Sequence, residues 1–162
     1  MSRNKVLEVE NIIKVYGKGE NRTEALRGIS FDVLEGEFLG IMGPSGSGKT
    51  TLLNSVATMI QVTSGNIRLK GEDISSFRGR KLSDYRGKEI GYLFQEFELL
   101  DNLTARENII LPLSLHGIAG REAETMFKKL ARHFDIEEEL YKFPSQMSGG
   151  QKQRVAAARA LI

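Results

Sequence analysis

Eight residues with three glycines, GPSGSGKT at positions 43–50, restrict the possible folds of this chain more than its overall composition does. They fit the pattern G-x-x-x-x-G-K-[ST] of a phosphate-binding loop. A continuous apolar run, residues 38–42, precedes the loop, and apolar residues at helical spacing follow it over residues 50–60. The sequence therefore predicts a buried strand, a glycine loop and a helix, in that order. A flexible glycine-serine turn is the alternative, and the flanking patterns argue against it.

The residue types of this loop match the chemistry of phosphate binding. Successive backbone N–H groups must converge on phosphate oxygens, and glycines leave that approach unobstructed. Lys49 supplies a positive charge for the β- and γ-phosphates, and the Thr50 hydroxyl is placed to ligate Mg²⁺. The following helix directs its N-terminal N–H groups at the same anion. We predict a phosphate site made of Gly43, Pro44, Ser45, Gly46, Ser47, Gly48, Lys49, Thr50 and Thr51.

Composition excludes several other classes of protein. The chain has 162 residues, of which 40% are hydrophobic and 27% charged, so we expect one globular unit with a real core. It has no cysteine and only two histidines, which excludes disulfides, thiolate zinc sites and His-rich metal sites. The net charge of +2 gives little support for nucleic-acid binding. No apolar run reaches the roughly 18 residues of a membrane span, and early glutamates interrupt any signal peptide.

Strand-like patterns fill the first part of the chain and helical patterns the second. Thr104 and Glu107 have the spacing of a capping box at a helix start, and Pro112 is expected to limit or kink that helix. Ser148 is expected to cap a last helix that reaches Ile162. Strands followed by helices indicate an α/β core that carries a helical subdomain. The expected strands are residues 7–16, 29–34, 38–42, 66–70 and 89–94, and an amphipathic helix is expected over residues 121–134.

A second glycine cluster lies at Ser148-Gly149-Gly150, after the apolar residue Met147. By itself, Ser-Gly-Gly is a common linker or cap. At the start of a helix with a serine cap, however, its backbone donors form a second anion site.

With both glycine clusters in this order, the chain resembles the ATP-binding subunits of ABC transporters over its whole length. The resemblance implies an α/β phosphate-loop NTPase of the ABC ATPase type, with N-terminal antiparallel strands and a helical subdomain. The family signature is Leu-Ser-Gly-Gly-Gln, and Met147 is a mild change at its apolar first position. The resemblance also implies that the ATP of a partner protomer is contacted by Ser148, Gly149, Gly150 and Gln151.

Two further residues resemble functional positions of that family. Gln95 resembles the Q-loop glutamine, whose family role is to sense Mg²⁺ and the attacking water and to contact the membrane subunit. Tyr16 resembles the aromatic residue that stacks on adenine, although an ordinary strand-end tyrosine is the alternative. The implied cofactors are ATP and Mg²⁺, with Thr50 and Gln95 at the metal. We expect a strand and phosphate-loop part, a helical subdomain and a signature helix over residues 1–95, 96–147 and 148–162.

Residues 40–54 and 94–109 are similar to a narrower group, the bacitracin-type antimicrobial-peptide resistance transporters, which belong with the lipoprotein-release and macrolide-export ATPases. This similarity implies an exporter of antimicrobial peptides or lipid-like substrates. It also implies two partners, an FtsX-like membrane permease and a second copy of the subunit, and no nucleic acid. The implied location is cytoplasmic, on the inner face of the cell membrane through the permease.

The family continues with a strand that ends in Asp-Glu, the Walker B strand, and later a switch histidine. Neither Asp101, which follows the Q-loop, nor Asp135, beside an amphipathic helix, is a credible substitute. We therefore expect a partial ABC domain, truncated before the Walker B strand, with Lys49 and Gln95 only as supporting catalytic groups. Poor nucleotide binding and no hydrolysis are expected for it. One alternative is a non-hydrolysing nucleotide-binding fragment of a truncated reading frame. Another is a chromosome-maintenance or repair ATPase, against which the absence of heptads between the two glycine clusters argues.

Overall fold

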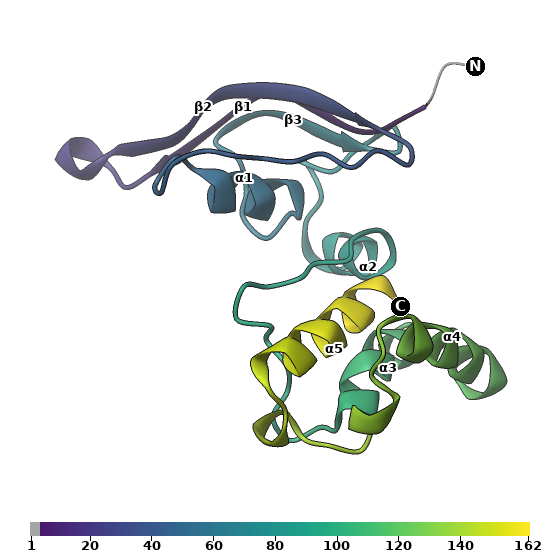
Figure 1. The fold of residues 1–162 in the computed structure, drawn as a ribbon. Helices are drawn as coiled ribbons and strands as arrows, with labels where there is room; N and C mark the ends of the chain where they lie inside the picture. The colour runs from purple at the N-terminus through teal and green to yellow at the C-terminus, as the bar shows by residue number, and fades with distance from the viewer. Residues whose placement is uncertain (1–3) are drawn as a thin grey trace. The chain divides into compact units, whose positions relative to one another are not determined.

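A computed structural model describes residues 4–162. The chain divides into two compact units, an N-terminal unit that ends at Arg86 and a C-terminal unit, Gly87–Ile162. Figure 1 shows a sheet with a helix in the first unit and packed helices in the second. Within residues 4–162, no helix has the length and apolar character that crossing a bilayer would require.

The N-terminal unit is built on a four-stranded antiparallel sheet with the strand order β2-β1-β3-β4. Three of the predicted strands are confirmed, and the second begins earlier than expected. The short 3₁₀ helix η1, Gly19–Asn21, lies between β1 and β2 and closes their hairpin. The strands are β1 (Lys5–Tyr16), β2 (Thr23–Leu34), β3 (Ser64–Leu69) and β4 (Glu72–Asp73).

A bulge in β1 keeps its apolar side chains on the core face. Leu7 and Val9 alternate in the usual way, but the next buried residue, Ile12, is three positions on. The pairing of β1 with β2 shifts between Val9 and Ile12, and Asn11 adopts a left-handed backbone with φ of 46°. The extra residue restores the inward direction of Ile12. Gly65 of β3 lies against this bulge, where a Cβ would be 2.4 Å from the Asn11 carbonyl oxygen.

Helix α1 (Lys49–Val56) packs against one face of the sheet (Figure 1). Leu52 is its main contribution to the core of this unit. The helix ends at Val56, four residues before the predicted end, and Thr58 then takes a left-handed φ of 58°. The core of the N-terminal unit consists of Leu7, Val9, Ile12, Leu26, Leu52, Ile67, Ile74 and Phe77.

Two predicted strands are wrong. Residues 38–42 are irregular, and Phe38 and Met42 are 98% and 94% exposed. A strand requires a neighbour that accepts and donates its backbone hydrogen bonds, and no segment of residues 4–162 pairs with this run. The second wrong strand is residues 89–94. Glu89 ends helix α2 (Gly79–Glu89), which was not predicted, and residues 90–94 are irregular.

The C-terminal unit contains the predicted helices, and α3 lies beside α5 in Figure 1. Both predicted N-terminal caps are confirmed, at Thr104 and at Ser148. Pro112 lies inside α3, which continues for three residues beyond it. The buried Asn108 joins the preceding loop to α3, since its amide accepts from Leu100 N and donates to the carbonyls of Leu100 and Leu103. The elements are α3 (Ala105–Leu115), α4 (Gly120–His133), η2 (Glu137–Glu139), η3 (Pro144–Gln146) and α5 (Gly149–Leu161).

Candidate nucleotide-binding site

The phosphate loop ends at a glycine that no other residue could replace without strain. Gly48 is the N-cap of α1 and has a φ of 92°, in the left-handed region. A Cβ at this position would lie 2.6 Å from the carbonyl oxygen of Ala25 in β2. The missing side chain therefore allows the loop to approach β2 closely and to turn directly into the helix.

Lys49 holds the loop in a curved shape. Its Nζ donates hydrogen bonds to the carbonyl oxygens of Gly43 and Pro44, over 2.8 and 2.7 Å. An ammonium group has three donors, so one N–H remains for a ligand oxygen. The first helical hydrogen bond runs from Leu52 N to Gly48 O. The N–H groups of the three residues before Leu52 thus lie at the open, partly positive end of the helix.

A groove of about 700 Å³ lies along this loop. One side is formed by Ser45–Thr51 and the other by β2 residues from Thr23 to Ile29. Tyr16 is paired with Thr23 at the end of the β1–β2 ladder, and its ring is partly covered by Lys14, whose Nζ is 5.0 Å from the ring centroid. The groove, the free helix N–H groups and the ammonium fit a nucleotide phosphate chain. That Tyr16 stacks on adenine stays a prediction.

The residues predicted at Mg²⁺ belong to different units. Thr50 is exposed in the first turn of α1, and Gln95 is exposed in a turn of the C-terminal unit. In the part of the chain that the structure describes, no group of three or more His, Cys, Asp or Glu residues could hold a metal ion by itself. Hydroxyl and amide oxygens are suitable ligands for Mg²⁺ alongside phosphate oxygens.

The turn that carries Gln95 is strained and is held by a residue that sequence reasoning missed. Phe97 and Glu98 both have positive φ values, 63° and 48°, which costs energy in residues other than glycine. Arg159, near the end of α5, donates to both carbonyl oxygens, at 2.7 Å for Phe97 and 2.6 Å for Glu98. Burial lowers the pKa of the Arg159 guanidinium, while the charge of Glu98 opposes this shift.

The second glycine cluster lies at the capped start of α5. Ser148 Oγ accepts from Gln151 N over 3.3 Å, and Gln151 Oε1 accepts from Ser148 N over 2.8 Å. This reciprocal box leaves the exposed N–H groups of Gly149 and Gly150 without a partner among residues 4–162. Met147 is only 7% exposed and belongs to the core of the C-terminal unit, so an apolar residue is required there.

Taken with the fold, these features define a phosphate-loop nucleotide-binding protein. A family model described as ABC transporter matches residues 26–162. The chain belongs to the ABC transporter family, and the resemblance stated from its sequence motifs is confirmed.

Curated relatives are similar over nearly the whole chain. The bacitracin export ATP-binding protein BceA of Halalkalibacterium halodurans is 46% identical over 157 residues, which are 97% of this chain and 62% of the relative. The lipoprotein-releasing system ATP-binding protein LolD of Geobacter metallireducens is 40% identical over 97% of this chain and 70% of its own length. The macrolide export ATP-binding/permease protein MacB of Marinobacter nauticus is 39% identical, and the chain spans 25% of it.

A solved structure confirms the fold class. It is described as a dimeric, post-hydrolysis state of the ATP-binding cassette MJ0796 bound to ADP and Pi. It matches 96% of this chain and 68% of its own length, with a TM-score of 0.88 and 36% identity. The phosphate-loop NTPase architecture of the ABC type, with antiparallel strands and a helical subdomain, is therefore established for this chain.

Proposed function

We propose that this chain is the ATP-binding part of an ABC exporter and that it holds ATP with Mg²⁺ at Gly43–Thr51, with the low affinity that its sequence leads us to expect. The observation that carries the proposal is the phosphate loop itself. Its lysine lies within the curve of the loop, its last glycine permits a left-handed turn against β2, and a helix N-terminus faces the groove. Backbone donors, a positive charge and a helix dipole at one place suit a polyphosphate.

In this proposal, each side chain has a separate task. Lys49 binds the β- and γ-phosphates, and its two carbonyl contacts orient its third donor. The Thr50 hydroxyl would hold Mg²⁺, which would neutralise phosphate charge, and Gln95 remains the second ligand that the family resemblance implies. The ring of Tyr16, which is paired with Thr23 at the end of the β1–β2 ladder, stacks on the adenine base. Lys49 and Gln95 are supporting groups for hydrolysis, because positioning and charge stabilisation are what phosphoryl transfer requires.

We further propose that two copies assemble head to tail, so that Ser148–Gln151 of one copy covers the phosphate bound to the other. The free N–H groups of Gly149 and Gly150 support this role, because they are exposed hydrogen-bond donors for which residues 4–162 provide no acceptor. The dimeric state of the similar ATP-binding cassette is consistent with it.

The relatives favour an exporter of antimicrobial peptides or lipid-like substrates, working with an FtsX-like permease at the cytoplasmic face of a membrane. BceA is described as a bacitracin export protein and LolD as part of a lipoprotein-releasing system. We propose that Gln95–Asn102 and the helices after it contact the permease. The parts 1–95, 96–147 and 148–162 remain our proposed functional division.

Binding of ATP with Mg²⁺ by the chain and its Lys49→Ala variant tests the proposal. Calorimetric titration should show binding weakened by about 10- to 100-fold in Lys49→Ala, since a hydrogen bond to a charged group contributes roughly 1.5–3 kcal/mol. Lys129→Ala, which removes an exposed lysine of α4, is the matched control and should bind like the wild type. Equal affinity in wild type and Lys49→Ala would show that the phosphate-loop assignment is incorrect.

A further inference from the structure

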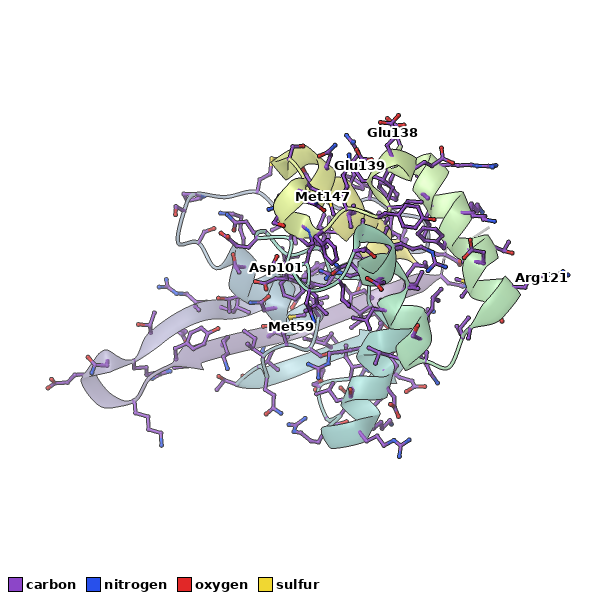
Figure 2. The ribbon with its side chains drawn as sticks, turned by 90° about the horizontal axis from the view of Figure 1, so that it is seen from below. Met59, Asp101, Arg121, Glu138, Glu139 and Met147 are labelled. Carbon is purple, nitrogen blue, oxygen red and sulfur yellow. The ribbon has the colours of Figure 1, made fainter. Side chains whose placement is uncertain are left out.

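Glu139, the last residue of η2, is a buried carboxylate that the proposed site does not use. It is 5% exposed, whereas its neighbours Glu137 and Glu138 are exposed. Figure 2 shows Glu138 at the outer end of the C-terminal unit, with its carboxylate directed away from the ribbon. Burial of a carboxylate is unfavourable unless other groups satisfy it, so its partners indicate why a glutamate stands here.

The main partner of Glu139 is the last residue of the signature segment. Gln151 Nε2 donates to Glu139 Oε1 over 2.5 Å, and Lys142 Nζ lies 3.7 Å from the same oxygen. The backbone at Glu139 is also fixed, because its N–H donates to Ile136 O and its carbonyl accepts from Lys142 N. The carboxylate is thus a rigid, charged acceptor for the Gln151 amide.

The opposite end of the same amide is part of the helix cap. Gln151 Oε1 accepts from Ser148 N, while its NH₂ group faces Glu139. If the amide were reversed, an oxygen would face the carboxylate and an NH₂ group would face an N–H donor. Both contacts would become repulsive, so only one orientation satisfies both neighbours.

We propose that Glu139 is a positioning residue for the signature segment. Its carboxylate fixes the direction of the Gln151 amide, which holds Ser148 in the capping box and keeps the N–H groups of Gly149 and Gly150 turned outward. That these groups receive a phosphate rests on the function proposed above. The fixing of Gln151 itself rests only on the contacts within the C-terminal unit.

The arrangement predicts that glutamine is more stable than glutamate at position 151. Glutamate and glutamine serve equally well at this position of a capping box, and the helix dipole favours an acid there. Glu139 reverses this preference, because Gln151→Glu would bring two carboxylates together in a buried place. Glu139→Gln in the same chain would restore one amide and one carboxylate, with their places exchanged.

Thermal unfolding of these variants forms the first test. Gln151→Glu should lower the melting temperature by at least about 2 °C, and the double variant Glu139→Gln/Gln151→Glu should recover most of that loss. Glu138→Gln/Gln151→Glu removes the same charge from an exposed neighbour and should not recover it. The proposal is overturned if Gln151→Glu is as stable as the wild type, or if the exchanged pair is no more stable than, or as poorly folded as, Gln151→Glu.

The second test is the side-chain amide signal of Gln151 in a ¹H–¹⁵N spectrum. A general effect on stability would not change the position of this signal. The signal should be shifted from that of a free glutamine, and Glu139→Gln should change it while Glu138→Gln should not. An unchanged signal in Glu139→Gln would contradict the proposal.

Both tests are made without nucleotide, so their outcome is independent of the proposed function. ATP-dependent self-association of the chain then tests the functional consequence, and Glu139→Leu should weaken it more than Glu138→Leu. If the wild type does not self-associate with ATP, the proposed dimer fails while the positioning of Gln151 stands on the first two tests. If it does so equally well in Glu139→Leu, Glu139 has no positioning role at the signature.

Discussion

The two glycine clusters both begin a helix, but they prepare the helix N-terminus in opposite ways. At α1 the N-cap is Gly48, which offers no side-chain hydrogen bond, and Lys49 adds a positive charge. At α5 the side-chain oxygens of Ser148 and Gln151 each accept a hydrogen bond from the other residue's backbone N–H. The first turn holds no charged residue before Lys152. The start of α1 depends on a left-handed glycine and carries a positive charge, whereas the start of α5 is closed by a side-chain cap and carries no charge before Lys152.

This difference supports the different roles that we propose for the two helix starts. A loop with free N–H groups and an ammonium can bind a polyphosphate by itself, because dipole and charge act together. A capped start with two exposed N–H groups has a weaker field and suits an anion that is already held elsewhere. The comparison therefore supports a primary site at Gly43–Thr51 and an accessory contact at Gly149 and Gly150.

The largest expected effect comes from alanine at Gly48, the N-cap of α1. Gly48→Ala places a side chain in the left-handed region and 2.6 Å from Ala25 O, so we expect a loss of about 2–4 kcal/mol of unfolding free energy. Gly149→Ala meets no atom within 4 Å in α5 and should change stability by less than about 0.5 kcal/mol. Urea unfolding of the two variants measures both changes in unfolding free energy. Equal losses would remove the distinction between the two helix starts.

A smaller effect is expected from loss of the relaxed cap. Ser148→Ala removes the acceptor of Gln151 N and should cost about 1 kcal/mol. Ser47→Ala, at the exposed position before Gly48, removes no cap of α1 and should cost much less. Amide hydrogen exchange in the first turn of each helix reports these changes locally. A larger increase over the wild-type exchange rate in α1 of Ser47→Ala than in α5 of Ser148→Ala would contradict the comparison.

Features that depend on neighbouring residues in the chain could be predicted from the sequence. The capping boxes at Thr104 and Ser148 follow from residues three positions apart, and the phosphate loop follows from eight consecutive residues. Strands β1 and β3 were predictable because their apolar residues face one core. The family, and with it the fold class, could be predicted because these local motifs occur in a specific order.

Features that depend on distant residues could not be predicted. The apolar runs 38–42 and 89–94 have the composition of strands. Whether such a run forms a strand depends on a second segment that pairs with it, and the composition of the run does not show whether that segment is present. Helix α2 was missed because it is mostly polar and contributes only Leu82 and Tyr85 to the core. The contacts of Arg159 with Phe97 and Glu98 join segments far apart in the chain, and no local sequence pattern indicates them.

Titration of the ¹⁵N-labelled chain with ATP and Mg²⁺ tests the unequal roles of the two helix starts most directly. At a concentration where the chain is monomeric, the backbone amides of Gly46–Thr51 should shift first and should saturate. The amides of Gly149 and Gly150 should move only when self-association begins. The account is contradicted if Gly149 and Gly150 respond in the monomer while Gly46–Thr51 stay unchanged.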